Sequence, residues 1–549
     1  MLDEKDVLER RLLEKLANLY NTGFRIVWAL VFLGLLFLAW RNRFIQDDAF
    51  ISFRYARNLV EGKGLVWNPG EHVEGYTNFL WTMMIAGGMK LGLDPVAFSE
   101  ILGLICFGFT LVFTYKLAGL VVSRDWSLLT VILLGTNYSF SAYATGGLET
   151  QLQALIFTAT MYLLFGVMKG DRKYSTIASL SLLLSIALLT RLDSAILAVV
   201  VIPVALFCIL KEKAAMQEKV IKELLLVLPL TAIISAWFAW KLAYYGDILP
   251  NTYYAKAVGA TDPIRGLWYI YSFLTEYWLA AFLLLGAVAI WIKRNSQMSV
   301  LLTFIVLWLA YIVKVGGDFM EYRVLMPVLP CMMLIVVRSI AWLGQARGVR
   351  IALVSMILAG SLLFGIRSSQ SSLNAISSLN VYDIESIQQL QGHLTDPTSD
   401  WEAVGKVLGE SLGRDVRIAV LPAGAIPYYS GLPAVDMRGL NDKWIARYGE
   451  VSGTMPGHQR KATLPYLVLK KVNLIIGQPA MVPSDEPLES AIARLDSRRF
   501  FAVRNWSDLP AGTKAIAIPV NEGYKAVILY IRPNPVIDQA IADHGWEVY

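Results

Sequence analysis

The sequence of 549 residues has few charged side chains, and this scarcity excludes a soluble globular protein. Asp, Glu, Lys and Arg make up only 17% of the residues, whereas 56% are hydrophobic. The mean hydropathy is +0.51, and soluble domains average about a quarter charged residues. We therefore expect an integral membrane protein that is longer than a single domain.

Cysteine, histidine and nucleotide-binding motifs are also scarce. The three cysteines, Cys106, Cys208 and Cys331, each lie within an apolar run, which favours buried small side chains over disulfides. The four histidines form no cluster with cysteine, so the sequence predicts no metal site of the zinc kind. No Walker A loop and no GxGxxG motif is present, which argues against ATP-driven transport.

Apolar segments of about 15–25 residues, the length that crosses a bilayer, recur through residues 24–366. They lie near 24–42, 77–92, 98–122, 126–140, 149–168, 175–191, 194–210, 222–244, 266–292, 298–314, 322–342 and 350–366. Basic residues between them explain the net charge of +6, and the positive-inside rule places their loops in the cytoplasm. These loops lie at 169–173, 211–222, 293–294 and 347–350.

The segment 77–92 differs from the others. It is short, it contains Gly87, Gly88 and Lys90, and a crossing here would conflict with the sides assigned to its neighbours. We expect it to be non-spanning or re-entrant, which leaves about eleven transmembrane helices.

Two regions follow from this pattern. Residues 1–23 are a charged cytoplasmic segment without a signal-peptide cleavage site, so we expect a retained anchor ahead of a membrane domain over 24–366. A serine-rich linker, 367–379, begins the remaining region, 367–549, in which "WEAVGKVLGESLG" predicts a helix. Strands are predicted by "DVRIAVL", "PAVDMRG", "VNLIIGQP" and "YKAVILYIRPN". The predicted fold class is an α-helical polytopic membrane protein with a C-terminal α/β domain, which the parity of the crossings places outside the cytoplasm.

Two adjacent aspartates, Asp47 and Asp48, follow the first apolar segment, where a carboxylate is costly without a partner or a function. One of them can cap an interfacial helix that ends at Gly62 and turns its aromatic residues to lipid. Alternatively, Asp47 and Arg54 share a helix face, since seven residues make nearly two turns, and Arg57 continues that face. A carboxylate beside guanidinium groups stays ionised near a phosphate, so this pattern predicts a base beside an anion-binding site.

Further polar groups gather on the same side of the membrane. Sugars stack on aromatic faces and bond to amides and carboxylates, so the aromatic loop 244–256 suits a glycan or a lipid-phosphate site. Structural alternatives are a helix cap for Glu149, a local ion pair for Arg191 and Asp193, and an aromatic belt at the lipid headgroups for this loop. The substrate-binding candidates are His72, Glu74, Tyr76, Asn78, Glu149, Arg191, Asp193, Asp247, Asn251, Tyr253 and Asp318. The cationic candidates are Arg54, Arg57, Lys256 and Arg323.

The stretch "DDAFISFRYARNLVEGKGLVWNPGEHVEGYTNFLW" resembles the first periplasmic loop, here 43–76, of GT-C superfamily glycosyltransferases, above all the mycobacterial terminal arabinofuranosyltransferases. "GGLET", "TRLDS", "GDILPNTYYAK" and "GAIPYYSGLPAVDMRGLND" support the resemblance. It implies that Asp47 or Asp48 is the catalytic base and that the donor is a polyprenyl-phosphate sugar. It also implies a bacterial inner-membrane enzyme whose acceptor lies outside the cytoplasm.

The chemistry that this resemblance implies fits the polar residues. A carboxylate accepts the proton of the attacking sugar hydroxyl, and external cations, chiefly Arg54 and Arg57, hold the leaving phosphate. We expect an inverting transferase of arabinofuranose that acts on a polysaccharide, glycolipid or protein. A lipid-linked sugar flippase, or a GT-C enzyme of another sugar such as mannose, is the alternative; the absence of internal repeats argues against a transporter. We expect no cofactor, although assistance by a divalent cation stays open, and no nucleic-acid partner.

Overall fold

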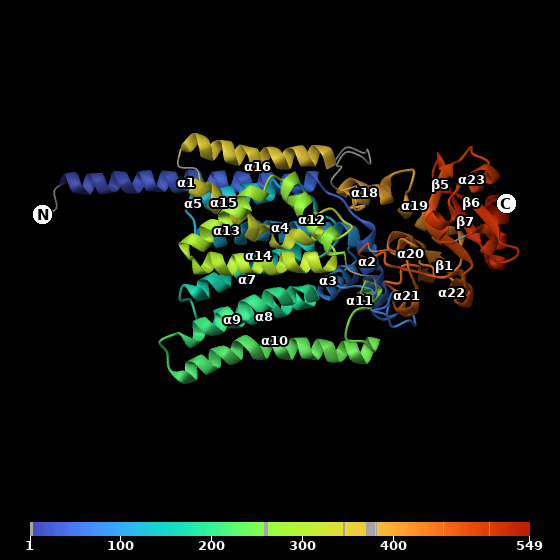
Figure 1. The fold of residues 1–549 in the computed structure, drawn as a ribbon, viewed down its shortest axis with the longest axis horizontal. Coiled ribbons are helices and arrows are strands. Elements are labelled where there is room, and N and C mark those ends of the chain that lie inside the picture. Colours follow the sequence, from blue (N-terminus) through green and yellow to red (C-terminus); the bar gives the residue numbers. More distant parts are fainter. Residues whose placement is uncertain are drawn as a thin grey trace.

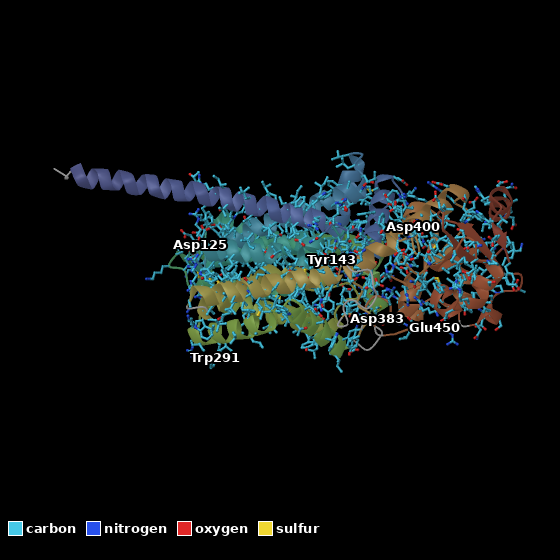
Figure 2. All side chains as sticks on the ribbon, turned by 90° about the horizontal axis from the view of Figure 1, so that it is seen from above. Asp125, Tyr143, Trp291, Asp383, Asp400 and Glu450 are labelled. Atoms are coloured by element: carbon cyan, nitrogen blue, oxygen red, sulfur yellow. The ribbon has the colours of Figure 1, made fainter. Side chains whose placement is uncertain are left out.

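The computed structural model describes residues 4–256, 262–343, 346–368, 379, 381–453, 455–503 and 505–549. Long helices run side by side along one axis, and a C-terminal domain packs against one end of this bundle (Figure 1). Figure 2 places Asp125 and Trp291 at the far end of the bundle, whereas Asp400 and Glu450 lie in the C-terminal domain. The predicted combination of a helical membrane region with a separate C-terminal domain is confirmed.

The described part of the bundle contains eight helices that are long and apolar enough to cross a membrane, or nine if one bent pair is a single span. The long helices are α1 (Glu4–Arg41), α4 (Pro95–Gly119), α7 (Thr150–Met168), α10 (Met216–Tyr245), α14 (Ser296–Val315) and α16 (Arg347–Ser368). Two more spans join a 3-10 turn to a helix: η1 (Leu192–Ser194) with α9 (Ala195–Leu210), and η2 (Arg323–Val328) with α15 (Leu329–Leu343). The protein is thus a multi-pass membrane protein, and its three cysteines are buried and free, as predicted.

The shorter helices differ in part from the prediction. The count of about eleven crossings included α5 (Arg124–Gly135) and α8 (Tyr174–Thr190), which have only 12 and 17 residues. Segment 77–92 forms the 12-residue α3 (Phe79–Lys90), in agreement with a segment that does not span. Segment 266–292 is not one helix: α12 (Pro263–Glu276) and α13 (Ala280–Lys293) meet at 99°. The break falls at Trp278, whose φ of 56° is left-handed and cannot continue a helix.

The helix α2 (Asp47–Val60) follows the end of α1 and lies between the helical bundle and the C-terminal domain (Figure 1). Gln46 occupies its N-cap position, so neither aspartate caps it. The alternative of an interfacial helix is wrong as well, because Phe50, Phe53 and Tyr55 are completely buried. The ring of Phe50 lies 5.4 and 5.3 Å from the rings of Tyr428 and Tyr429, so its partner is the C-terminal domain rather than lipid.

The C-terminal domain contains a mixed sheet in the order β2-β1-β5-β7-β6-β8, whose β1 is parallel to β2 and β5. Four of its strands, β1 (Ile418–Val420), β2 (Ala434–Asp436), β5 (Leu474–Pro483) and β7 (Tyr524–Tyr530), were predicted, as was α19 (Trp401–Ser411). The prediction missed β6 (Lys514–Pro519) and the terminal β8 (Glu547–Val548). Two further strands, β3 (Glu450–Val451) and β4 (Arg460–Lys461), form a separate hairpin. The predicted linker 367–379 lies almost entirely outside the described residues.

Short helices surround this sheet and complete the contact with the bundle. They are α18 (Ile387–Thr395), α20 (Ala425–Ser430), α21 (Lys443–Tyr448), α22 (Leu464–Leu469), α23 (Leu488–Arg494), α24 (Ser497–Phe501), η3 (Trp506–Asp508) and α25 (Pro535–His544). Two more, α6 (Tyr138–Ala142) and α11 (Asn251–Lys256), belong to loops of the bundle. The segment 424–442, which carries α20 and β2, supplies most of the polar contacts to α2 and its following loop, and we call it the docking segment.

Candidate active site

A cavity of about 140 Å³ lies between the end of the helical bundle and the C-terminal domain. The bundle and its loops contribute Gln46, Asp47, Asp48, Ile51, Lys256 and Arg323 to its lining. The C-terminal domain and the chain leading to it contribute Glu385, His393, Trp401, Arg438, His458 and Gln478. Both predicted carboxylates therefore share one cavity with two of the four predicted cations.

The first aspartate is held by the C-terminal domain. The backbone N–H groups of Gly424 and Ala425 donate to Oδ2 and Oδ1 of Asp47 over 3.0 and 2.7 Å. Burial raises the pKa of Asp47 to about 7; the N–H of Ala425 opposes this shift, and the charge of Asp48 adds to it. A carboxyl group with such a pKa is poised for proton transfer near neutral pH.

The second aspartate faces the cations. Burial raises the pKa of Asp48, and the charges of Arg323 and Lys256 act against this rise. Arg323 itself donates from Nε to Oδ2 of Asp318 over 2.8 Å, and this ion pair fixes its guanidinium beside the cavity. Lys256, at the end of α11, has no salt bridge with a described residue. This side of the cavity is therefore suited to an anionic group.

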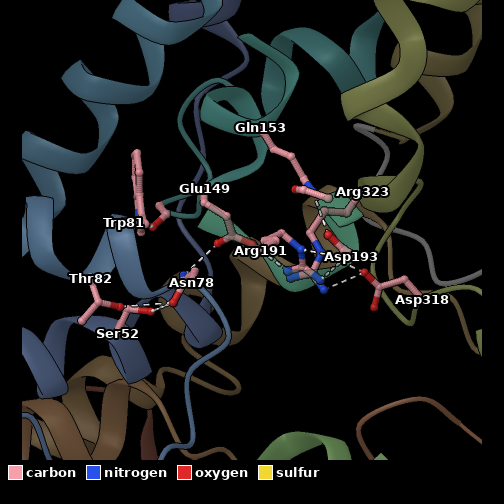
Figure 3. Close-up of polar contacts among 12 residues, drawn as sticks. Ser52, Asn78, Trp81, Thr82, Glu149, Gln153, Arg191, Asp193, Asp318 and Arg323 are labelled. Carbon is pink, nitrogen blue, oxygen red and sulfur yellow. Dashed lines mark hydrogen bonds and ion pairs between the residues drawn. The ribbon is translucent and has the colours of Figure 1, made fainter. Parts of the chain in front are cut away.

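Behind the cations lies a network of buried charged side chains (Figure 3). Nη1 of Arg191 lies 2.7 Å from Oε1 of Glu149, and its Nη2 lies 2.8 Å from Oδ2 of Asp193. The predicted local pair of Arg191 and Asp193 is present, but Arg191 also bridges to a second helix. Asn78 donates to the other oxygen of Glu149 over 2.7 Å. Glu149 occupies the N-cap position of α7, as the alternative expected, but its side chain makes no capping hydrogen bond.

The side chain of Gln46 presents an unsatisfied amide to the cavity. Gln46 is 1% exposed, and neither its Oε1 nor its Nε2 has a hydrogen-bond partner among the described residues. A buried amide without a partner destabilises a protein by roughly 1–3 kcal/mol. A polar ligand in the cavity would supply the missing bonds.

A histidine and a glutamate from the far wall lie close to Asp47. Nε2 of His393 lies 3.2 Å from Oε2 of Glu385, and its ring stacks on Trp401 with the centroids 4.3 Å apart. Burial lowers the pKa of His393, but the bond to Glu385 and the charges of Glu385 and Asp47 outweigh it, so the net pKa is raised. His393 therefore tends to carry positive charge toward Asp47.

Arg54 and Arg57 do not reach this cavity, which corrects the prediction that they are the chief phosphate ligands. Arg54 is 2% exposed and donates to the carbonyl oxygens of Trp67, Pro427 and Leu432. Arg57 donates to the carbonyl of Tyr428 over 2.8 Å and lies over its ring. Both therefore bind the docking segment, and the expected pairing of Arg54 with Asp47 is not formed among the described contacts.

The remaining predicted residues are also bonded to protein groups. Glu74 forms a buried pair with Lys241 at 2.8 Å, and Tyr76 bonds to the hydroxyl of Tyr245. His72 contacts the carbonyl of Tyr244, which places it on the outer surface of the loop.

The predicted aromatic loop meets the C-terminal domain instead of forming a free binding surface. Asp247 pairs with Arg447 at 3.0 Å, and Asn251 donates to the carbonyls of Gly439 and Leu440 in the docking segment. Tyr253 is 52% exposed. Residues 257–261, within the loop expected to lie outside the cytoplasm, fall outside the described chain.

Several cavity residues escaped the sequence analysis, namely Gln46, Glu385, His393, Arg438, His458 and Gln478. Gln46 adjoins the aspartate pair, and this adjacency was a usable signal. The others come from a region without a recognised catalytic motif, and only the fold brings them to the cavity. Within the described chain, no group of three or more His, Cys, Asp or Glu side chains is arranged to hold a metal ion.

In sequence, this chain is similar to one family model and to two curated proteins. Residues 384–549 match a family model described as "Domain of unknown function (DUF8728)". The terminal beta-(1->2)-arabinofuranosyltransferase of Corynebacterium glutamicum is 28% identical over 327 residues, 52% of this chain and 46% of the relative. The enzyme of the same name from Mycobacterium tuberculosis is 24% identical over 338 residues, 54% and 52% of the two chains. The chain thus spans about half the length of the curated relatives it matches.

The structural comparison covers nearly the whole chain. Crystal structures of ArnT from Cupriavidus metallidurans match with TM-scores of 0.54 in the apo state and 0.55 with bound undecaprenyl phosphate. Both are 13% identical; they cover 93% and 94% of this chain and 98% and 99% of theirs. The protein is therefore a multi-pass membrane protein with the GT-C glycosyltransferase fold. Within that class, the relatives that its sequence resembles are the terminal arabinofuranosyltransferases.

Proposed function

We propose that this protein is an inverting glycosyltransferase that moves arabinofuranose from a polyprenyl-phosphate donor to a glycan, glycolipid or protein acceptor outside the cytoplasm. The observation that carries the proposal is the shared cavity, in which Asp47 and Asp48 face Lys256 and Arg323. The names of the two sequence relatives support the sugar. Undecaprenyl phosphate bound to the structural neighbour ArnT supports the class of donor.

Asp47 is the proposed catalytic base. Its carboxylate accepts the proton of the acceptor hydroxyl while that oxygen forms a bond to the anomeric carbon of the donor. The bond from the anomeric carbon to the phosphate oxygen breaks on the opposite face, and its electron pair leaves with the lipid phosphate. A single displacement of this kind inverts the anomeric centre.

Lys256 and Arg323 are the proposed cations for the leaving phosphate. Lys256 ends α11, and Arg323 begins the span Arg323–Leu343, so both lie where the bundle meets the cavity. A lipid-linked donor can keep its chain in the bilayer while its phosphate reaches these side chains. The charge that develops on the phosphate is stabilised by these two cations, of which Arg323 is held in place by Asp318.

The wall formed by the C-terminal domain is the proposed acceptor side. Arg438, His458 and Gln478 line it and offer hydrogen-bond donors and acceptors to sugar hydroxyls. The cytoplasmic assignment of the basic loops supports a location of this wall outside the cytoplasm.

The proposal is tested with purified protein in detergent, a synthetic polyprenyl-phosphate arabinofuranose and candidate acceptors. Mass spectrometry of the product should show one added pentose without any membrane gradient, which a flippase would not give. Asp47→Asn should lower turnover about 100- to 10,000-fold because a general base is lost. The exposed Asp485→Asn serves as the control for charge removal. Turnover of Asp47→Asn comparable to the parent protein would refute Asp47 as the base.

A further inference from the structure

The carboxylate of Asp47 is held by a turn that lies 377 residues further along the chain. Gly424 donates its N–H to Oδ2 and Ala425 donates its N–H to Oδ1, so each carboxylate oxygen has one bond. Asp48 and Gln46, its two neighbours in sequence, have no such bonds within the described structure. The turn therefore binds the carboxylate of Asp47 and not that of Asp48.

The turn approaches Asp47 at the distance of direct backbone contact. A Cβ atom added at Gly424 would lie 1.9 Å from the backbone oxygen of Asp47, so no side chain can be accommodated there. Two arginines of α2 hold the residues that follow this turn. Arg54 donates to the carbonyls of Pro427 and Leu432, and Arg57 donates to the carbonyl of Tyr428. The contact is therefore built by several residues on both partners.

Two backbone N–H groups have two physical effects on a carboxylate. They fix its rotation about χ2, and they favour the ionised form over the neutral acid. A carboxylate has about four acceptor positions, so about two stay available for a sugar hydroxyl. A base that is correctly oriented needs no reorganisation when the hydroxyl arrives.

We propose that the turn 421–425 of the C-terminal domain is a positioning element of the active site, which orients Asp47 for proton transfer. The inference rests on the proposed function and assigns a role to a domain that matches a family model of unknown function. In this arrangement neither the bundle nor the C-terminal domain contains a complete catalytic site by itself.

Ala425→Pro is the variant that tests the turn. Ala425 is the first residue of α20, a helix position that tolerates proline. Proline removes the N–H and places its ring Cδ where the hydrogen pointed at Asp47. We expect turnover to fall about a hundredfold, the loss typical of a misplaced catalytic group. The Michaelis constant for the donor should stay near that of the parent. The matched control, Ala425→Ser, keeps the N–H and should keep the parent turnover.

The pH profile separates positioning from a general loss of structure. Ala425→Pro should move the acid limb of turnover to higher pH, because an N–H that favours ionised Asp47 is gone. Other charged groups surround Asp47, and His393 could itself produce the acid limb. The same profile is therefore measured in His393→Gln, in which a limb that remains belongs to Asp47. The surrounding groups are Asp48 on α2, His393 on α18, Glu385 before α18, Lys256 on α11, Arg323 on η2, and Arg438 and His458 of the C-terminal domain.

A second variant covers the outcome in which Ala425→Pro does not fold. Lactic acid incorporated in place of Ala425 replaces the amide by an ester, which removes the N–H without adding a ring. If either folded variant keeps both the turnover and the acid limb of the parent, the positioning role is wrong. If instead the parent protein adds no pentose to any acceptor in the mass-spectrometric assay, the proposed function itself fails, so the two failures are distinguishable.

Discussion

Two chemically identical neighbours, Asp47 and Asp48, have different surroundings. Asp47 accepts two backbone N–H groups from the C-terminal domain, whereas Asp48 faces Arg323 and Lys256. Adjacent residues of a helix point about 100° apart, so a helix can present one aspartate to each partner. The sequence predicts that the pair is catalytic. Which aspartate contacts which partner depends on residues some 200 to 380 positions away, so the sequence alone does not distinguish them.

The charge of Asp48 should affect the pH dependence of turnover. As the proposed base, Asp47 must be ionised, so turnover should fall as the pH drops through the pKa of about 7. Asp48→Asn removes a negative neighbour that raises this pKa, so the acid limb should move to lower pH. The measurement is kcat/KM between about pH 5 and 9. A limb displaced to higher pH would contradict the assignment, and the exposed Asp485→Asn should leave the limb in place.

Gln46→Met tests whether the unsatisfied amide serves a substrate. Methionine is close in size and needs no hydrogen bond, so the variant should unfold at the same or a higher temperature. The Michaelis constant for donor or acceptor should rise, because a hydrogen-bonding group of the cavity is lost. A variant that unfolds at a lower temperature with unchanged kinetics would make Gln46 a structural residue.

At the scale of elements, α2 and the docking segment act as one unit. Arg54 connects them through the carbonyl groups of Pro427 and Leu432, and it also donates to the carbonyl of Trp67 in the loop after α2. The sequence analysis assigned this arginine to the donor phosphate, because an arginine beside an aspartate in a loop is consistent with either role. Only its distant partners, 373 and 378 residues away, distinguish the two.

Arg54→Met should therefore destabilise the contact between bundle and C-terminal domain. Leaving the carbonyls without a donor should lower the free energy of unfolding on the order of 3 kcal/mol. Arg57→Met, which loses one bond from a partly buried arginine, should cost about 1 kcal/mol. Thermal unfolding in detergent and the rate of limited proteolysis measure both effects. If Arg54→Met instead unfolds like the parent and raises only the donor Michaelis constant, the earlier phosphate assignment is restored.

Much of the fold follows from local patterns. Apolar runs of the right length predicted the long helices, and short β-rich stretches predicted β1, β2, β5 and β7. The bend between α12 and α13 was missed because Trp278 gives no breaker signal of the kind that glycine or proline gives. In the site, the four cavity residues Asp47, Asp48, Lys256 and Arg323 were predictable as charges near a membrane surface. His393, Arg438 and His458 were not, because tertiary packing alone brings them there.

At the scale of the whole molecule, the orientation in the membrane can be tested with cysteine labels. The three native cysteines are buried and should react little with a maleimide, so labelling of a single introduced, exposed cysteine can be measured. Asp485→Cys in the C-terminal domain should react with a membrane-impermeant maleimide in intact spheroplasts. Lys213→Cys, in a basic loop between α9 and α10, should react only after lysis. The reverse pattern would overturn the proposed topology.

The separation of Asp47 from Gly424 also orders the protein's biosynthesis. The ribosome makes α2 first, and the two N–H groups that orient its carboxylate follow 377 and 378 residues later. Bundle helices can insert and pack while translation continues, but a nascent chain shorter than 425 residues lacks the turn. On the proposed function and topology, competence for transfer arises only after the C-terminal domain has crossed the membrane and folded onto α2. Truncated or stalled copies would occupy the membrane without consuming lipid-linked sugar.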